Sequence, residues 1–202
     1  MCPVERETAV IDCAIALLSE RGAEDVTMAD IAKSAGMSKR TLYELFTSRE
    51  ELLGAGLARM GAKLFRPLRP DERDASLEER LRILLTLSPS WEPPEVVIKM
   101  LRAVIAEVPT YPDLGRRLSR TGPGQVVDLL VEELSRAAET GEIELRADEI
   151  VPTAELLVDM VVGNTIPCLL DPDRILSLPE EQAARRDRAL AIFLNGVRPR
   201  NA

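Results

Sequence analysis

Apolar residues recur along this chain with the 3.6-residue period of an α-helix, and this period limits the possible folds more than any other feature. Segments with this pattern repeat from about residue 5 to residue 194, separated by Ser or Thr caps and by Gly or Pro stops. Alternation with a period of two, which indicates β-strands, is almost absent. Because 46% of the residues are hydrophobic, the chain can bury a core. We therefore predict an all-α protein of about nine helices.

These helices are expected to form a small N-terminal unit and a larger C-terminal unit. The segment 66–76 (RPLRPDERDAS) is the best candidate for a linker, because its two prolines and mixed charges leave little to bury. Near the end of the chain, one helix is expected from about Val151 to Leu169 and another from about Glu181 to Leu194. The first is apolar almost all round, so it needs two buried faces.

The chain contains no histidine, which excludes Ser-His-Asp and Cys-His triads and imidazole general bases. Its cysteines, Cys2, Cys13 and Cys168, lack CxxC spacing, so free thiols in a reducing compartment are expected. No metal site and no cofactor are predicted. The sequence shows no signal-peptide pattern, and its longest weakly charged stretch is too short to span a bilayer. We therefore expect a cytoplasmic protein with no membrane partner.

The most informative segment is 27–49, TMADIAKSAGMSKRTLYELFTSR. Thr27 and Asp30 have capping-box spacing at the start of one short amphipathic helix, and Ser38 can cap a second. Gly36 between them supplies the positive φ that a tight reversal needs. This order and spacing are typical of a helix-turn-helix, whose second helix enters the major groove of DNA.

The second helix carries the side chains that such a groove requires. Lys39 and Arg40 in its first turn can donate to guanine, and the methyl group of Thr41 can contact thymine. Tyr43 and Arg49 are long enough to reach phosphate oxygens. The segment 33–49 has a net charge of +3 although the whole chain has −8. The global acidity thus indicates where DNA can touch the protein and does not exclude it.

The run from Glu7 to Leu53, and above all Thr27-xx-Asp30-Ile31-Ala32-xxx-Gly36-Met37-Ser38-xx-Thr41-Leu42-Tyr43-xx-Phe46-xx-Arg49-Glu50-xx-Leu53, resembles the DNA-binding domain of the TetR/AcrR family of transcriptional regulators. The resemblance covers about a quarter of the chain. Many members have histidine where this chain has Leu45, so a polar contact is lost there and Leu45 is expected in the core. Arg49 stands where lysine is commoner in the family.

The resemblance implies a ligand-responsive regulator, usually a repressor, that binds a double-stranded DNA operator as a homodimer and is released by an unknown small-molecule effector. It implies a helix-turn-helix domain at residues 1–49 and an effector-binding and dimerisation domain at residues 50–202. The expected DNA-binding residues are Thr27, Ser38, Lys39, Arg40, Thr41, Tyr43 and Arg49.

Residues for the effector and the partner subunit are harder to select from the pattern alone. The candidates for an effector pocket are Met60, Phe65, Trp91, Met100 and Tyr111, although ordinary packing could explain each of them. The two last helices could form an intermolecular four-helix bundle, with contacts from Leu157, Val161, Leu190, Phe193 and Leu194. Alternatively, the apolar Val151–Leu169 helix is simply the central helix of its own domain.

Two other kinds of function remain open at this stage. The overall acidity would also suit an all-α dimeric interaction protein that keeps the helix-turn-helix only as a scaffold. An enzyme that uses carboxylates or cysteines is a remote third reading, because no pair of such residues has catalytic spacing. We therefore expect no enzyme activity.

Overall fold

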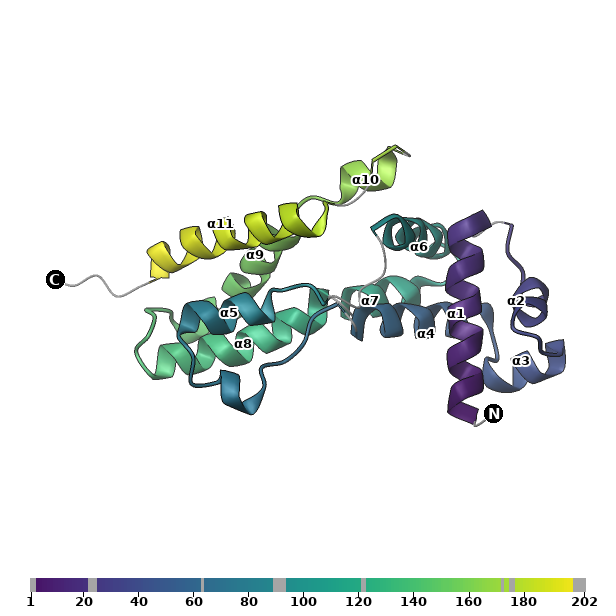
Figure 1. The fold of residues 1–202 in the computed structure, drawn as a ribbon, viewed down its shortest axis with the longest axis horizontal. Coiled ribbons are helices and arrows are strands. Elements are labelled where there is room, and N and C mark those ends of the chain that lie inside the picture. The colour runs from purple at the N-terminus through teal and green to yellow at the C-terminus, as the bar shows by residue number, and fades with distance from the viewer. Residues whose placement is uncertain are drawn as a thin grey trace. The chain divides into compact units, whose positions relative to one another are not determined.

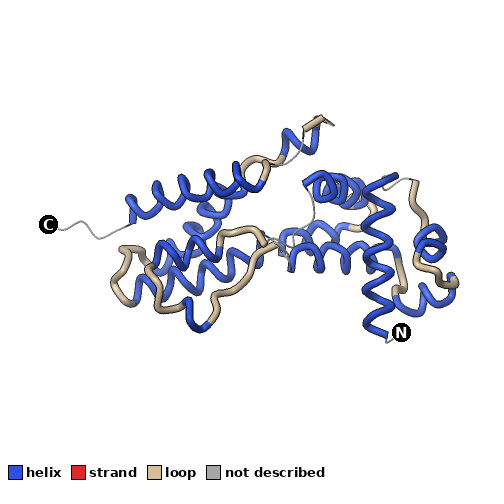
Figure 2. The backbone as a smooth tube through the Cα atoms, in the orientation of Figure 1, coloured by secondary structure: helices blue, strands red, loops and turns tan. Residues whose placement is uncertain are grey.

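The computed structural model describes residues 3–21, 25–62, 64–88, 94–120, 123–171, 173–174 and 177–197. Throughout these residues the regular structure is helical and no strand occurs (Figure 2). The α-helices are α1 (Pro3–Arg21), α2 (Met28–Ser34), α3 (Lys39–Leu45), α4 (Arg49–Ala62), α5 (Leu77–Leu84), α6 (Pro94–Glu107), α7 (Pro112–Arg120), α8 (Pro123–Glu139), α9 (Ile150–Val162), α10 (Ile166–Leu170) and α11 (Pro179–Val197). Two short 3₁₀ helices, η1 (Pro70–Glu72) and η2 (Ala147–Glu149), complete the described elements. The predicted all-α fold class is confirmed.

Packing divides the chain into two units, each assembled from separate parts of the sequence. Unit 1 comprises Met1–Met60, Glu92–Thr121 and Cys168–Leu176, and unit 2 comprises Gly61–Trp91, Gly122–Pro167 and Ser177–Ala202. The boundary expected after residue 49 therefore differs from the division by packing, because α4 continues through unit 1 and α6 and α7 join it. The segment 66–76, expected to be a linker, lies inside unit 2.

Unit 1 is organised around α1. One side of this helix packs against α2, and another packs against α6 (Figure 1). The buried residues of α1 are Val10, Ile11, Ala14, Ile15, Leu17 and Leu18. Their helical spacing is the reason that a single helix can support both neighbours.

Unit 2 has an apolar core built by α5, α8, α9 and α11. Helix α9 packs against both α8 and α11, which gives its nearly uniform apolar surface two partners within one chain. The single helix expected from Val151 to Leu169 is wrong: α9 ends at Val162, and α10 begins at Ile166. Gly163 between them has φ +79°, and this left-handed conformation stops the helix.

The residues predicted to contact a partner subunit lie in the core of unit 2. At most 9% of each of these side chains is exposed, and the five are Leu157, Val161, Leu190, Phe193 and Leu194. Their role in a partner contact stays a prediction, and in the structure each of these side chains is already covered within the protomer. The exposed large apolar residues of α9 and α11 are Val151, Leu156 and Ile192.

A buried ion-pair network joins α5 to α8. Arg80 is 3% exposed and Glu133 is 6% exposed, and Arg80 Nε donates to Glu133 Oε1 over 2.6 Å. Arg80 Nη2 donates to both oxygens of Glu142, and Arg136 Nη2 donates to Glu133 Oε1 over 2.8 Å. Because buried charges lose hydration, this network stabilises the fold only while every member keeps its partners.

The segment 66–76 is held by a second ion pair. The Arg66 guanidinium donates to the two oxygens of Glu72 over 2.7 and 2.6 Å, and the backbone amide of Arg69 donates to Glu72 over 2.7 Å. These hydrogen bonds lower the pKa of Glu72 to about 2. The charges that suggested a solvated linker thus fold the segment onto itself.

Replacing Glu133 by alanine should destabilise the protein by about 3 kcal/mol, because Arg80 would keep its charge in the core with fewer partners. Urea unfolding followed by circular dichroism measures this loss. The matched control is Asp148→Asn, which breaks the exposed Arg146–Asp148 pair and should change stability little. Equal effects of the two substitutions would contradict the role assigned to the buried network.

The Glu72→Gln variant should be less stable than the wild type at pH 7 and indistinguishable from it near pH 2. Because the folded state lowers the pKa of Glu72, its contribution is complete above the ordinary glutamate pKa of about 4.5. It is then lost as the pH falls through about 2. Urea midpoints of both proteins between pH 7 and pH 2 test this, and a difference that is constant across that range would contradict it.

Candidate nucleic-acid interface

Thr27 fixes the start of α2 through a reciprocal capping box. Its hydroxyl accepts from the Asp30 amide over 3.2 Å and donates to Asp30 Oδ2 over 2.5 Å, while the Thr27 amide donates to the same oxygen over 2.9 Å. These hydrogen bonds from the Thr27 side chain and backbone lower the pKa of Asp30. The predicted cap is confirmed, and it fixes the Thr27 side chain at the beginning of the motif.

The turn between α2 and α3 also forms as the sequence predicts. Gly36 has φ +65°, and the Met37 amide donates to the Ala32 carbonyl over 2.9 Å. Ser38 then caps α3, because its hydroxyl accepts from the Thr41 amide over 3.1 Å. The Ser38 and Thr41 hydroxyls are themselves 2.9 Å apart, so both side chains lie at the start of α3.

A shared apolar core holds the two short helices together. Ile31 of α2, Leu42 of α3 and Phe46, which follows α3, are each at most 2% exposed. Val26, which precedes the cap, is buried as well. Leu45 is only half-buried, so its expected place in the core is confirmed in part. With these apolar residues turned inward, the opposite side of α3 faces solvent.

The exposed side of α3 carries the side chains predicted to meet DNA. Lys39 and Arg40 are exposed, and half of Tyr43 is exposed. Arg40 Nε donates to Glu44 over 3.0 Å, but the Arg40 side chain is 88% exposed. Since such a surface pair contributes little stability, Arg40 can exchange Glu44 for a base or a phosphate at low cost.

One groove of about 630 Å³ brings together four of the predicted residues. We call it the α2–α3 groove, and it is lined by Val26, Thr27, Met28, Ala29, Lys39, Tyr43, Arg49 and Glu107. Three separate elements supply these residues: Thr27 caps α2, Lys39 and Tyr43 belong to α3, and Arg49 begins α4. This combination of elements is expected of a surface that contacts the phosphate backbone of DNA. The role of each residue in DNA binding stays a prediction.

Arg49 lies in this groove in a setting that the sequence did not reveal. Its Nε donates to Glu107 Oε1 over 2.9 Å, and its Nη1 donates to the Val26 carbonyl. Both charged side chains are 18% exposed. Glu107 lies 58 residues along the chain, at the end of α6, and no local motif identifies it. Its carboxylate is the one acidic group among the lining residues of the groove.

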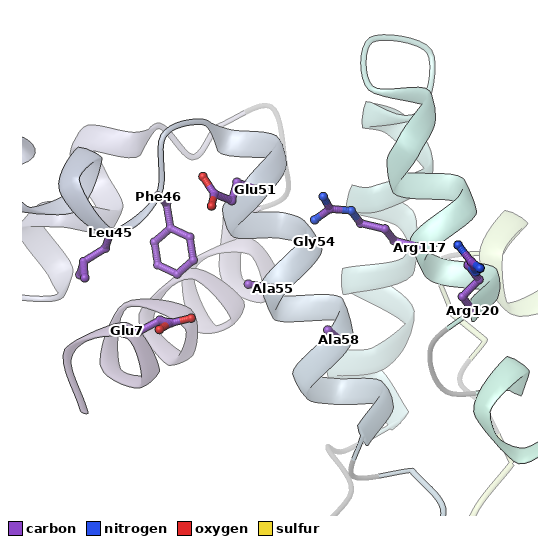
Figure 3. Close-up of a pocket in the computed structure, with 9 residues that line it drawn as sticks. All are labelled: Glu7, Leu45, Phe46, Glu51, Gly54, Ala55, Ala58, Arg117 and Arg120. Carbon is purple, nitrogen blue, oxygen red and sulfur yellow. The ribbon is translucent and has the colours of Figure 1, made fainter. Parts of the chain in front are cut away.

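A second pocket, of about 400 Å³, lies on the other side of the first turns of α4. We call it the α4–α7 pocket, and its lining is Glu7, Leu45, Phe46, Glu51, Gly54, Ala55, Ala58, Arg117 and Arg120 (Figure 3). Figure 3 shows Arg117 extending from α7 toward α4 at Gly54, with Glu51 nearby on α4. A Cβ atom at Gly54 would clash with Arg117 Nη1, so only glycine allows the guanidinium to lie where it does.

Glu51 organises the junction between α3 and α4. It accepts from both the hydroxyl and the backbone amide of Thr47, each over 2.7 Å. These hydrogen bonds lower the pKa of Glu51, and the nearby Arg117 cation lowers it further. Ser48 also caps α4, because its hydroxyl accepts from the Glu51 amide over 3.1 Å.

The residues predicted for an effector pocket are not gathered at one site by the described part of the structure. Met60 and Met100 are buried in unit 1, whereas Phe65 belongs to the core of unit 2. Tyr111 is half-buried, and Trp91 lies outside the described residues. An effector role for these residues stays a prediction.

Two further features are absent from the described residues. No helix there is long and apolar enough to cross a membrane. The same residues contain no group of three or more histidine, cysteine or acidic side chains that could hold a metal ion.

Comparison with known proteins identifies both parts of the chain. The family model "Bacterial regulatory proteins, tetR family" matches residues 10–55, and "AefR-like transcriptional repressor, C-terminal domain" matches residues 94–196. The HTH-type transcriptional regulator YvkB of Bacillus subtilis (strain 168) is 25% identical over 195 residues, which is 93% of this chain and 95% of that protein.

Solved structures show the same fold over nearly the whole chain. The Flavonoid-responsive Regulator FrrA matches with a TM-score of 0.72 and 25% identity, covering 98% of this chain and 99% of that one. A TetR transcriptional regulator from Agrobacterium tumefaciens matches with a TM-score of 0.68 and 23% identity, covering 96% and 95%.

The C-terminal family model alone spans half of the chain, and the N-terminal model covers the helix-turn-helix. The chain therefore belongs to the TetR family of bacterial regulatory proteins, which are ligand-responsive DNA-binding transcriptional regulators and not enzymes.

Proposed function

We propose that this protein is a repressor that binds a palindromic operator as a homodimer and leaves it when a small molecule binds. The observation that carries the proposal is the α2–α3 groove, which gathers Thr27, Lys39, Tyr43 and Arg49 beside the exposed start of α3. A regulator of this kind acts in the cytoplasm, where bacterial DNA lies.

In the proposed complex, α3 enters the major groove and the α2–α3 groove follows the phosphate backbone. Lys39, Arg40 and Thr41 face base edges from the first turn of α3. Thr27, Tyr43 and Arg49 contact phosphates of the DNA backbone and fix the position of the protein along the duplex. Ser38 orients the start of α3. The acidic remainder of the chain repels DNA from other faces.

A second copy of this chain completes the operator-binding unit in this proposal. Helices α9 and α11 pack against each other and still expose Val151, Leu156 and Ile192. Pairing these faces across a two-fold axis forms a four-helix bundle, which covers apolar surface that the protomer leaves in water. Two-fold symmetry would present two copies of α3 to half-sites one helical turn apart, about 34–36 Å.

The effector is proposed to shift the population toward a dimer whose recognition helices no longer fit the operator. One relative, FrrA, is a flavonoid-responsive regulator by name, which makes flavonoids the first compounds to test against the operator complex. The described part of the chain carries only a few aromatic side chains, so the proposal includes no aromatic cage for a cation.

Replacing Arg40 by alanine should weaken binding to the preferred operator by about 1–3 kcal/mol and relax selectivity at one base position. The operator is obtained by selecting sequences from a random DNA library with the wild-type protein, and affinities follow from fluorescence anisotropy. The matched control is Arg146→Ala, which removes another exposed cation, from unit 2, and should leave affinity unchanged.

Salt titration separates this proposal from the alternative of an interaction protein. If Lys39, Arg40 and Arg49 meet DNA, their removal lowers the dependence of affinity on salt concentration. Unspecific binding whose salt dependence survives their removal would contradict operator recognition and favour the interaction protein.

Placing glutamates at Leu156 and Ile192 should convert the protein to a folded monomer, because the proposed bundle would then bury like charges. Light scattering after size-exclusion chromatography measures the mass, and circular dichroism verifies the fold. The control is Ile105→Glu, which changes an exposed apolar residue of unit 1 and should leave the dimer intact. A dimer that survives the double substitution would place the interface elsewhere.

A further inference from the structure

The first turns of α4 are held from two sides by helices outside the helix-turn-helix. On one side, Arg49 pairs with Glu107 at the end of α6. On the other, Arg117 of α7 lies across Gly54 and lines the same pocket as Glu51 (Figure 3). All these residues belong to unit 1, so each contact lies within one packed body.

The Arg49 contact reaches the entrance of the helix-turn-helix. While Nε binds Glu107, Nη1 donates to the carbonyl of Val26, the residue directly before the Thr27 cap of α2. Val26 is buried, and the Arg49 and Glu107 side chains are mostly shielded from water. Shielding strengthens the attraction between the two charges, so the pair can hold the 26–28 segment in place.

The Arg117 contact reaches the exit of the helix-turn-helix. Glu51 accepts two hydrogen bonds from Thr47, which lies just after α3. Because Gly54 has no side chain, the Arg117 guanidinium can lie against α4 close to Glu51. A displaced Arg117 would leave the first turns of α4 without this contact from α7, and Glu51 holds Thr47 from those same turns.

We propose that Glu107 and Arg117 are positioning residues for operator recognition. Glu107 acts through Arg49 on the start of the helix-turn-helix, at residues 26–28, and Arg117 acts through Glu51 on its end, at Thr47. The proposal rests on the operator binding proposed above. Neither residue lies on α2 or α3, and Glu107 is acidic, so neither would be selected as a DNA contact. Their effect arises because base contacts require a fixed orientation of α3.

Glu107 allows a test in which two effects have opposite signs. Its carboxylate lines the groove that would hold a phosphate backbone, so simple electrostatics predicts that removing it strengthens all DNA binding. If Glu107 instead positions Arg49 and the 26–28 segment, its removal weakens specific binding only. We expect Glu107→Ala to weaken operator binding about tenfold and to leave binding of random-sequence DNA equal or stronger.

The route through Arg49 is tested by a double-mutant cycle on operator affinity. If Glu107 acts through Arg49, then Glu107→Ala should have no further effect in an Arg49→Met background. A merely structural role would give additive losses, and so would an independent DNA contact. The control is Glu95→Ala, which removes an exposed carboxylate from the first turn of the same helix and should leave operator affinity unchanged.

The route through Arg117 is tested with Gly54→Ala, whose Cβ would displace the guanidinium. It should weaken operator binding about tenfold while random-sequence binding stays unchanged. Gly196→Ala is the control, because a Cβ there meets no atom within 4 Å. If Gly54→Ala does not fold, Arg117→Met removes the same cation without adding bulk to α4 and should give the same loss.

The outcomes separate this proposal from the proposed function. If the wild type selects no sequence from a random library, the operator-binding proposal itself fails. If the wild type selects an operator but Glu107→Ala and Arg117→Met bind it as the wild type does, only the positioning roles are overturned. A stronger specific complex after Glu107→Ala would show electrostatic repulsion alone and would also overturn the role of Glu107.

Discussion

The burial of Ile31, Leu42 and Phe46 is the interaction on which the proposed interface depends. Each of the two helices has only seven residues, and helices that short are not stable alone in water. Burying three large side chains supplies about 2 kcal/mol for each of them. The same burial fixes which side of α3 faces outward, so packing determines where Lys39 and Arg40 lie.

Charge then acts on two scales around this core. Globally the chain is acidic, and locally the segment 33–49 is basic, so the recognition face differs in sign from the remainder. Within unit 1, paired charges connect that face to the helices that follow it in the sequence. Arg49 pairs with Glu107, and Arg117 approaches α4 at Gly54, so both arginines join elements that lie far apart along the chain. A change at α6 or α7 can therefore reach α3 through α4.

The sequence was sufficient to predict the elements whose signals are local. The cap formed by Thr27 and Asp30, the turn at Gly36 and the cap at Ser38 each depend on residues close by in the sequence. The structure confirms the first cap, the positive φ and the second cap. Gly163 carried a signal of the same kind, but the long apolar run around it suggested one continuous helix. Gly54 had no readable signal, because its role depends on a side chain from α7.

Features that depend on packing between distant residues were harder to predict from the sequence. Leu157 and Phe193 have the apolar character of interface residues, but pattern alone cannot distinguish a face covered by the same chain from one covered by a partner. Glu107 was missed for a related reason, since its significance comes from Arg49, 58 residues away. Likewise, the charges of Arg66 and Glu72 suggested a linker, whereas in the structure their ion pair closes the segment 66–76 into a loop.

The central claim is that operator DNA is bound by α3 and the α2–α3 groove. Hydrogen exchange of the backbone amides with and without the selected operator tests this most directly, because it locates the contact surface without any substitution. The account predicts that the operator slows exchange in residues 26–31 and 38–50. Protection confined to unit 2, or no protection in residues 38–45, would contradict it.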